Sequence, residues 1–178
     1  MKNFYIGLLC LLPLVSCSQN KPQDAELNLN HGVLPQQSFS TLKFEADGKP
    51  CIALINNRYI EFKDKKKFPL SFFIMVNTLN KKQDGHPDEK ETLLFNSLQT
   101  EIIQELNKVL KQYCYIGTTT MAGYRDILLY IKAEDQEKAT EALKSLKAKN
   151  QRINTLSLEI DHEWEAVASF YEAIAVKD

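Results

Sequence analysis

The stretch PLSFFIMVN (residues 69–77) decides the fold of this chain. Its apolar residues at every second position share one face of an extended strand: Leu70, Phe72, Ile74 and Val76. We therefore predict a central strand here and place the other elements around it. A turn follows at residues 83–89, with Asp84-Gly85 as the reversal and Pro87 near the first helical turn.

A long helix is predicted from this turn to about Gln112. Apolar residues recur in it at three- and four-residue intervals: Leu94, Leu98, Ile102, Leu106, and Val109 or Leu110. Residues 113–119 return to a strand pattern, Met121-Ala122-Gly123 turns the chain, and YRDILLYIK (residues 124–132) forms the second arm of this hairpin.

The C-terminal part predicts helix, strand and helix. Residues 134–149 are amphipathic, with Ala139, Leu143 and Leu146 inward, and TLSLEI (residues 155–160) alternates strictly. Asp161 is placed to cap a final helix in which four residues share a face: Trp164, Val167, Tyr171 and Ile174.

From residue 69 onward, the predicted order is therefore β-α-β-β-α-β, which is that of a ferredoxin-like α+β sandwich. Both helices would cover one face of an antiparallel sheet. Upstream, TLKFEA, PCIALI and RYIEF (residues 41–46, 50–55 and 58–62) predict two successive N-terminal β-hairpins. These hairpins and the C-terminal helix would cover the other face or leave it open. The lysine run at residues 63–67 is interpreted as a solvated loop rather than a headgroup-binding patch.

The first residues predict a lipoprotein signal. Lys2 precedes an apolar run from Phe4 to Val15 that is shorter than the roughly 20 residues of a membrane-spanning helix. Residues 14–17, LVSC, resemble the bacterial lipobox, in which the cysteine sulfur receives a diacylglyceryl group and the chain is cut before that cysteine. Cys17 would then be a lipidated N-terminus carrying fatty acyl chains such as palmitate. The alternative is an ordinary secretory signal with an incidental cysteine.

Three segments follow from this interpretation: a signal peptide (1–16), a lipidated flexible tether (17–40) and a single α+β domain (41–178). The tether is rich in Gln, Asn and Pro and poor in apolar residues. By resemblance to lipoprotein sorting, Ser18 favours the outer membrane, with the domain facing the periplasm. Without residues 1–16, 21 Lys and Arg remain against 23 Asp and Glu, a balance that argues against nucleic acid as a partner.

Cys51 and Cys114 would lie in an oxidising compartment. They either form a disulfide or are two buried thiols on strands.

Three segments resemble the recurring blocks of the bacterial family of unknown function DUF695. They are DGHPDEKE, IGTTTMAGYRDILLYI and DHEWEAVASFYEA, and the resemblance covers roughly residues 68–175. The family has no established activity, so the resemblance implies a fold. Some relatives are joined to, or look similar to, a ferredoxin-like regulator of a ribonuclease, which implies a module that binds protein. A periplasmic member cannot regulate a cytosolic ribonuclease, so the implication here is a binding module.

Several polar residues are candidates for a binding site. Arg125 begins a strand face that is otherwise apolar, so it needs a carboxylate, for which Asp84 or Asp161 is available, or an anionic ligand. Tyr124 and Tyr130 share the opposite face with Asp126, where aromatic rings on an open sheet would form a platform. If the final helix covers them instead, they belong to a second small core with Trp164.

No metal or cofactor site is predicted. His86 lies between Asp84 and Asp88, and His162 between Asp161 and Glu163, but neither spacing brings three ligands together. We also find no nucleophile elbow and no glycine-rich phosphate loop. The leading hypothesis is a non-enzymatic, lipid-anchored binding module whose partner is an envelope protein or a small molecule. The alternative is an envelope hydrolase that uses Asp84, His86, Arg125 and Asp161 in one cleft.

Overall fold

The structure is a computed structural model that describes Leu34 and residues 37–176. The signal peptide, Cys17 and most of the tether lie outside the described residues. Six strands form one antiparallel sheet in the order β1-β2-β4-β5-β3-β6. Their bounds are β1 Phe39–Ala46, β2 Lys49–Asn56, β3 Leu70–Asn77, β4 Cys114–Met121, β5 Tyr124–Ile131 and β6 Ile153–Ile160.

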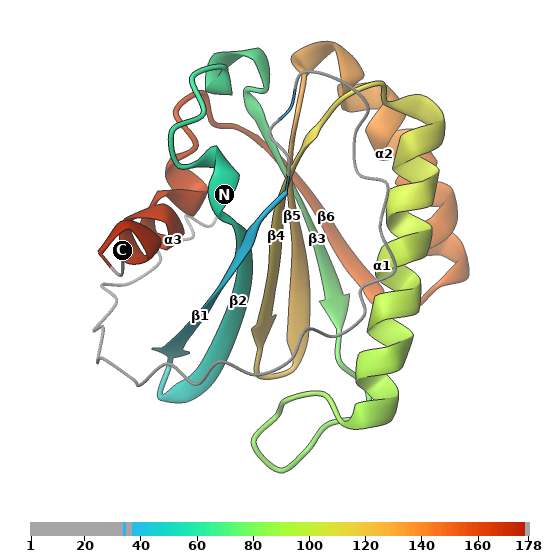
Figure 1. Ribbon diagram of the computed structural model, residues 1–178. Coiled ribbons are helices and arrows are strands. Elements are labelled where there is room, and N and C mark those ends of the chain that lie inside the picture. Colours follow the sequence, from blue (N-terminus) through green and yellow to red (C-terminus); the bar gives the residue numbers. More distant parts are fainter. Residues whose placement is uncertain (1–33, 35–36, 177–178) are drawn as a thin grey trace.

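The helices lie on both faces of this sheet (Figure 1). Helices α1 (Glu89–Val109) and α2 (Gln136–Lys149) cover one face, which we call the helix side, and α3 (Glu165–Ala175) lies on the other, the α3 side. Short 3-10 helices are found at η1 (Asn57–Tyr59), η2 (Lys65–Lys67) and η3 (Ala133–Asp135). This arrangement confirms the predicted α+β class.

Strand β3 is central, as predicted. It pairs with β5 on one edge and with β6 on the other. Its alternating apolar residues are at most 5% exposed and form the middle of the helix-side core: Leu70, Phe72, Ile74 and Val76. The odd-numbered residues of the strand face α3.

Helix α1 is rotated slightly from the predicted orientation. Leu98, Ile102 and Leu106 are buried as predicted, but Leu94 is 40% exposed and Phe95 occupies the core in its place. The buried face of the helix begins with Glu91, and Phe95 lies four residues further along the same face.

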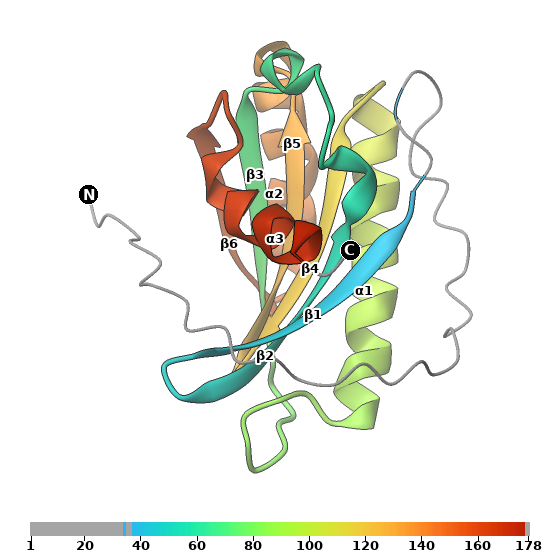
Figure 2. The ribbon, with the colours of Figure 1, turned by 60° about the vertical axis from the view of Figure 1, so that its left-hand side comes forward.

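The α3 side holds a second core around Trp164. Figure 2 shows α3 lying across this face of the sheet. The Trp164 indole is fully buried, stacks on the ring of Tyr130 with 4.3 Å between centroids, and donates its Nε1 hydrogen to the carbonyl of Phe68. Helix α3 therefore covers this half of the sheet, and Tyr130 is a core residue rather than part of an open aromatic platform.

The prediction of a second N-terminal hairpin is wrong. Residues 58–62, predicted as a strand, instead form η1 and a loop, because the Asn56 side chain accepts a hydrogen bond from the Arg58 N–H and turns the chain. Tyr59 and Phe62 then pack edge-on or tilted against Trp164, at 5.7 Å between centroids in each case. The apolar residues in this stretch serve the second core.

The lysine run after this loop is engaged in local contacts. Lys66 pairs with Glu163 and Lys67 with Asp64, and Lys65 lies 5.7 Å above the Trp164 ring. The lysine side chains of this run lie at the protein surface, which agrees with a solvated loop.

Cys51 and Cys114 do not form the disulfide that the sequence left open. Both are free and buried. In the register of β2 with β4, Ile52 is opposite Thr120, six residues along the strand from Cys114, or about 20 Å. A disulfide needs less than about 7 Å between the Cα atoms, so these cysteines act as two separate buried thiols.

Gly117 allows the N-terminal hairpin to join the sheet. It has φ +145° at an irregularity in β4, and a Cβ atom built there would be 1.9 Å from the backbone oxygen of Leu54. We expect Gly117→Ala to lower the free energy of unfolding by about 3 kcal/mol or more, because backbone cannot yield as a flexible side chain can. Urea denaturation followed by circular dichroism measures this.

Gly48→Ala is the matched control, because Gly48 also has a positive φ (+68°) but a Cβ atom placed on it would have nothing within 4 Å. Gly48→Ala should lower the free energy of unfolding by about 1 kcal/mol, because only the left-handed backbone conformation disfavours alanine there. Equal losses for the two variants would contradict the close approach of β2 and β4.

Candidate functional site

The predicted site residues occupy four separate places. The first is a buried cluster at the start of α3. The Tyr130 hydroxyl donates to Asp161 Oδ2 at 2.6 Å, and the two carboxylate oxygens also accept from the backbone N–H groups of Glu165 and Ala166. Asp161 therefore caps α3, as predicted, and fixes Tyr130 beneath Trp164. These groups hold the fold together.

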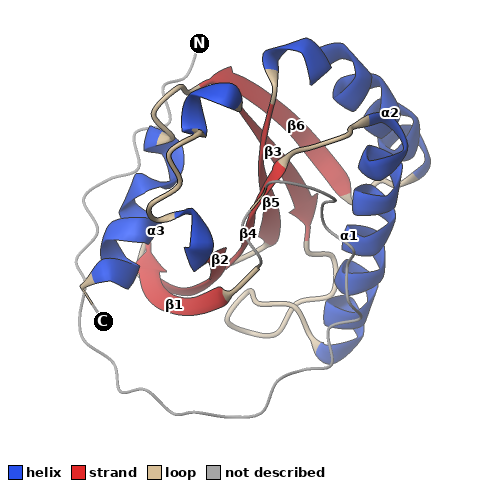
Figure 3. Cartoon of the chain, turned by 45° about the horizontal axis from the view of Figure 1, so that its top comes forward, coloured by secondary structure: helices blue, strands red, loops and turns tan. Residues whose placement is uncertain are grey.

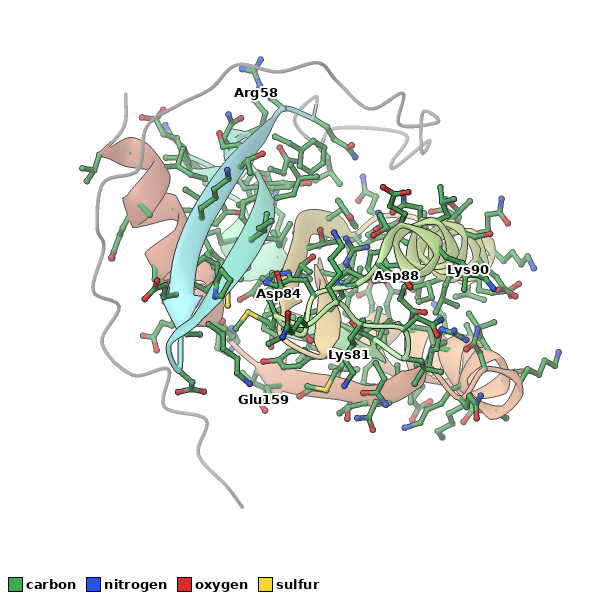
Figure 4. All side chains as sticks on the ribbon, turned by 90° about the horizontal axis from the view of Figure 1, so that it is seen from below. Arg58, Lys81, Asp84, Asp88, Lys90 and Glu159 are labelled. Atoms are coloured by element: carbon green, nitrogen blue, oxygen red, sulfur yellow. The ribbon has the colours of Figure 1, made fainter. Side chains whose placement is uncertain are left out.

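The second place is the loop of residues 78–88 at the opposite end of the sheet (Figure 4). Asp84 Oδ1 accepts from the His86 backbone N–H at 2.9 Å, and the His86 ring bonds to the carbonyl of Pro50 in β2. The Gly123 N–H donates to the Gly85 carbonyl at 3.0 Å. These bonds attach the loop to the strand ends, and the labelled Lys81, Asp84 and Asp88 lie along it.

This separation removes the geometry that the hydrolase alternative requires. Leu70 pairs with Ile160, the neighbour of Asp161, whereas Val76 pairs with Arg125. Six residues of strand separate the two pairs, or about 20 Å. General acid and base groups must approach within hydrogen-bonding distance of the reacting atoms. Asp161 is therefore too far from the other three residues to act with them.

Arg125 is the third place, on the helix side of β5. Its Nε donates to Thr120 Oγ1 at 2.9 Å, and its guanidinium carbon lies 4.1 Å from the centre of the Phe95 ring. Among the described residues, no carboxylate pairs with it, and its buried NH1 atom has no hydrogen-bond partner. Burial lowers the pKa of Arg125 to about 10, even though the nearby Glu91 favours the charged form. Neither Asp84 nor Asp161, the two carboxylates predicted as partners, pairs with Arg125.

A buried ion pair that was not predicted from the sequence lies next to Arg125. Glu91 is 3% exposed and accepts from Arg152 Nε and NH2 at 3.1 and 3.2 Å. It also accepts from the backbone of Leu79 and from the backbone and side chain of Asn80. Burial alone would raise the pKa of Glu91, but these hydrogen bonds outweigh it and lower the pKa to about 2.

This pair fastens the beginning of α1 to the end of β3 and the beginning of β6. A local signal for it exists in the sequence, since Asp88-x-x-Glu91 before an apolar run is the spacing of a capping box. The Asp88 carboxylate does accept from the Glu91 N–H at 2.7 Å. The Glu91 side chain points inward instead of back to the helix start, because Arg152 lies there.

An exposed apolar surface lies beside Arg125 on the N-terminal hairpin. Along β1 and β2, the side chains on the α3 side are buried or half-buried except Lys49, and those on the helix side are exposed except Asn56. Phe39, Ile52 and Leu54 are 37%, 40% and 36% exposed there. We call five of the exposed helix-side residues of this hairpin the hairpin face: Phe39, Thr41, Lys43, Ile52 and Leu54. The exposed Glu45 and Pro50 lie beyond them on the same side, next to the β1–β2 turn.

The strand register connects the hairpin face to Arg125. Lys43 pairs with Ile52, Ile52 with Thr120, and Thr120 with Arg125, so the four side chains form one row across four strands. The Phe39 ring contacts Tyr115 of β4 at 6.1 Å, and the Tyr115 hydroxyl accepts from Gln99 of α1. The hairpin face is thus an apolar surface with a cation, Arg125, at its inner end. Figure 3 shows the hairpin of β1 and β2 at the edge of the sheet opposite to β6.

The fourth place holds Tyr124, which lies with Asp126 on the α3 side near the same strand ends, and both are half-buried. Asp126 Oδ2 accepts from Thr119 Oγ1 at 3.0 Å. Burial raises the pKa of Asp126 to about 6, although the Thr119 hydrogen bond acts in the opposite direction. Tyr124 is therefore near a partly desolvated carboxylate and separate from the core that holds Tyr130.

No metal site is found among residues 37–176, where no three His, Cys, Asp or Glu side chains converge. In the same part of the chain, no helix has the length and apolar content needed to cross a bilayer.

A family model described as a family of unknown function (DUF695) matches residues 37–171. The match begins before β1, so it includes the hairpin, whereas the three sequence blocks indicated a start near residue 68. No curated protein and no solved structure matches the chain.

We expect Glu91→Gln to lower the free energy of unfolding by about 3 kcal/mol at pH 7, because the charged form of Glu91 is favoured in the folded state. The folded-state pKa lies below the ordinary value of 4.5, so this stabilisation is present above pH 4.5 and is lost as the pH falls towards 2. Urea titrations between pH 2 and 7 should show the two proteins converging in acid. A constant difference would contradict the charged pair.

Asp126→Asn should change the free energy of unfolding in the opposite direction to Glu91→Gln. The folded-state pKa of Asp126 lies above its ordinary value of 3.8, so the stabilisation of its neutral form is complete below pH 3.8 and is lost as the pH rises through about 6. Asparagine mimics the neutral acid, so the variant should be more stable than the wild type at pH 8, by about 1 to 3 kcal/mol. Thermal unfolding at pH 4 and pH 8 tests this, and a variant that is less stable at pH 8 would refute it.

Proposed function

This chain belongs to the family of unknown function DUF695, and we propose that it is a non-enzymatic binding module whose hairpin face docks a segment of a partner protein. The partner segment carries apolar side chains and one carboxylate. The single observation that carries this proposal is the position of the unpaired Arg125 guanidinium at the inner end of an exposed apolar surface.

We also propose that strands β3 to β6 with α1 and α2 form a ferredoxin-like unit. Two split β-α-β units support this. In the first, α1 connects the parallel strands β3 and β4, which have β5 between them. In the second, α2 connects β5 and β6, which have β3 between them. Interleaved units of this kind define the fold, and the β1–β2 hairpin is then an addition to its β4 edge.

The other polar candidates already form hydrogen bonds within the protein, and this favours a binding function over catalysis. Asp161 is occupied by Tyr130 and the α3 backbone, and Glu91 by Arg152. His86 contacts a backbone carbonyl of β2. Arg125 differs from these groups because, among the described residues, its guanidinium contacts one neutral hydroxyl and one aromatic ring and forms no salt bridge.

The chemistry of the surface defines its occupant. A guanidinium pairs best with a carboxylate, through two parallel hydrogen bonds, and an interaction of this kind is strongest where water is excluded. Phe39, Ile52 and Leu54 would provide that exclusion once apolar side chains of the partner cover them. Lys43, at the outer end of the row, adds a second positive charge, and the exposed Glu45, two residues further along the same side of β1, adds one negative charge. The surface therefore fits an acidic and apolar polypeptide segment.

The proposed location is the periplasmic side of the outer membrane, with lipid on Cys17. The tether predicted at residues 17–40 would have an average span of about 25 to 30 Å, from 5 to 6 Å times the square root of its length. The domain would then remain near the bilayer while its hairpin face turns towards envelope proteins.

Site-specific photocrosslinking in cells tests the docking surface. A benzophenone amino acid replaces Ile52 on the hairpin face, or Leu93 as the control, an apolar α1 residue that is 71% exposed. We expect a crosslinked partner from position 52 and none from position 93. The crosslinked peptide should contain Asp or Glu within a few residues of the attachment point.

A double-mutant cycle with a synthetic copy of that peptide then tests the role of Arg125. Arg125→Gln should weaken binding of the peptide to the full-length chain at least tenfold, because it removes one member of a buried charged pair. Replacing the peptide's acidic residue by its amide should have the same effect, and the two changes together should cost little more than either alone. Additive losses, or equal crosslinking from both positions, would overturn the proposal. Circular dichroism checks that Arg125→Gln remains folded.

A further inference from the structure

Strand β6 ends the sheet on the side opposite to the hairpin, and its outer edge has a regular set of unpaired backbone groups. The Asp161 N–H donates to the Pro69 carbonyl, and the register pairs Glu159 with Ser71. In an antiparallel ladder, every second residue bonds to the neighbouring strand. The odd-numbered residues of β6 therefore bond to β3, and the N–H and C=O groups of Leu156, Leu158 and Ile160 point outward.

The unpaired part of this edge is limited to residues 156–160. The outward carbonyl of Asn154 accepts a hydrogen bond from Lys147 Nζ of α2, so it is already satisfied. Beyond Ile160, the chain turns into the Asp161 cap of α3. Six outward backbone groups remain, on three alternate residues, and no described residue bonds to them.

From Leu156 to Ile160, the edge of β6 also lacks the features that protect edge strands. The irregularity in its pairing with β3 lies before this part, at Asn154. The opposite edge strand, β1, has Lys43 and Glu45 at its exposed positions. Strand β6 has a single charge, Glu159, no proline and no lysine, and its Ile160 side chain is 74% exposed. Natural sheets place lysine, proline or bulges at edges that must stay unpaired. An edge without them is adapted to receive another strand.

We propose that the β6 edge binds the β6 edge of a second copy of this chain, antiparallel, with a two-fold axis at Leu158. In this register, Leu158 pairs with the second copy's Leu158, and Leu156 with the second copy's Ile160. All six outward groups of each copy are then satisfied, and no group that already has a partner is used.

The side chains agree with this register. The exposed Ile160 packs beside the second copy's Leu156 on the helix side. On the other face, Glu159 lies opposite the second copy's Ser157. The Ser157 hydroxyl donates to Glu159 Oε1 of its own copy at 3.4 Å, and in the dimer it would donate to the carboxylate of the second copy instead. A register centred on Glu159 would instead place two carboxylates against each other, and one centred on Ser157 would require the occupied carbonyl of Asn154. The dimer buries little surface, so we expect it to be weak and dependent on concentration.

Disulfide trapping tests the register. Ser157→Cys and Glu159→Cys are made separately in the full-length chain and oxidised alone or mixed. Opposed residues in a non-hydrogen-bonded pair have Cα atoms about 4.5 Å apart, within range of a disulfide. We expect crosslinked dimers in the mixture and not in either variant alone. Dimers from Ser157→Cys alone would show a different axis, and no dimer in any sample would show that the edge does not self-associate; each result overturns the proposal.

Charge reversal gives a second readout by sedimentation velocity over a concentration series. Ser157→Glu places two pairs of like charges across the axis and should weaken dimerisation about tenfold. The double variant Ser157→Glu/Glu159→Lys restores opposite charges and should return the affinity to near the wild-type value. Ile52→Lys, on the hairpin face, is the matched control and should leave dimerisation unchanged. Failure of the double variant to recover would overturn the proposed pairing even if the single variant weakened it.

Discussion

The pairing of β2 with β4 is the contact on which the rest of the molecule depends. It extends over four residue pairs only, from Ile52 to Ile55, and the irregularity at Gly117 brings the two backbones close together there. This pairing widens a sheet of four strands to six. The α3-side residues of the hairpin, Ala53 and Ile55, become part of the core under Trp164. Its helix-side residues extend past the two helices and stay exposed.

A sheet of six strands has more width than two helices of 21 and 14 residues can cover. Packing one helix occupies roughly 10 Å, about two strand spacings. Helices α1 and α2 therefore account for about four strands, and two are left over on that face. The hairpin face is the part of the sheet that α1 and α2 leave uncovered. Arg125 lies at the boundary between the covered and uncovered parts, and no described carboxylate pairs with its guanidinium. This charge gives the uncovered surface a preference for a particular kind of partner.

The order of the elements from β3 to α3 followed from local patterns, since period-two strands and a helix with apolar residues three and four apart are strong signals. Leu94 was misplaced because two adjacent apolar residues satisfy the same helical stripe, and tertiary packing selected Phe95. The strand predicted at residues 58–62 failed because aromatic residues suit a strand and a core loop equally well. The ion pair of Glu91 with Arg152 could not be found from sequence, since the two residues are 61 positions apart and meet only after the sheet forms. The buried position of Tyr130 depended in the same way on where α3 lies.

Trp164 has a consequence for how this protein is observed. It is the only tryptophan of the chain, it is fully buried, and it stacks on Tyr130 beneath α3. Its backbone adopts a left-handed conformation, with φ 62°, immediately before the helix. Indole emission therefore reports on one side of the sheet alone, while the helix-side core contains tyrosines and no tryptophan. Tryptophan fluorescence reports on the α3 side, whereas far-ultraviolet circular dichroism reports on all helices and strands. A difference between the unfolding curves from the two methods therefore measures how independently α3 leaves the sheet.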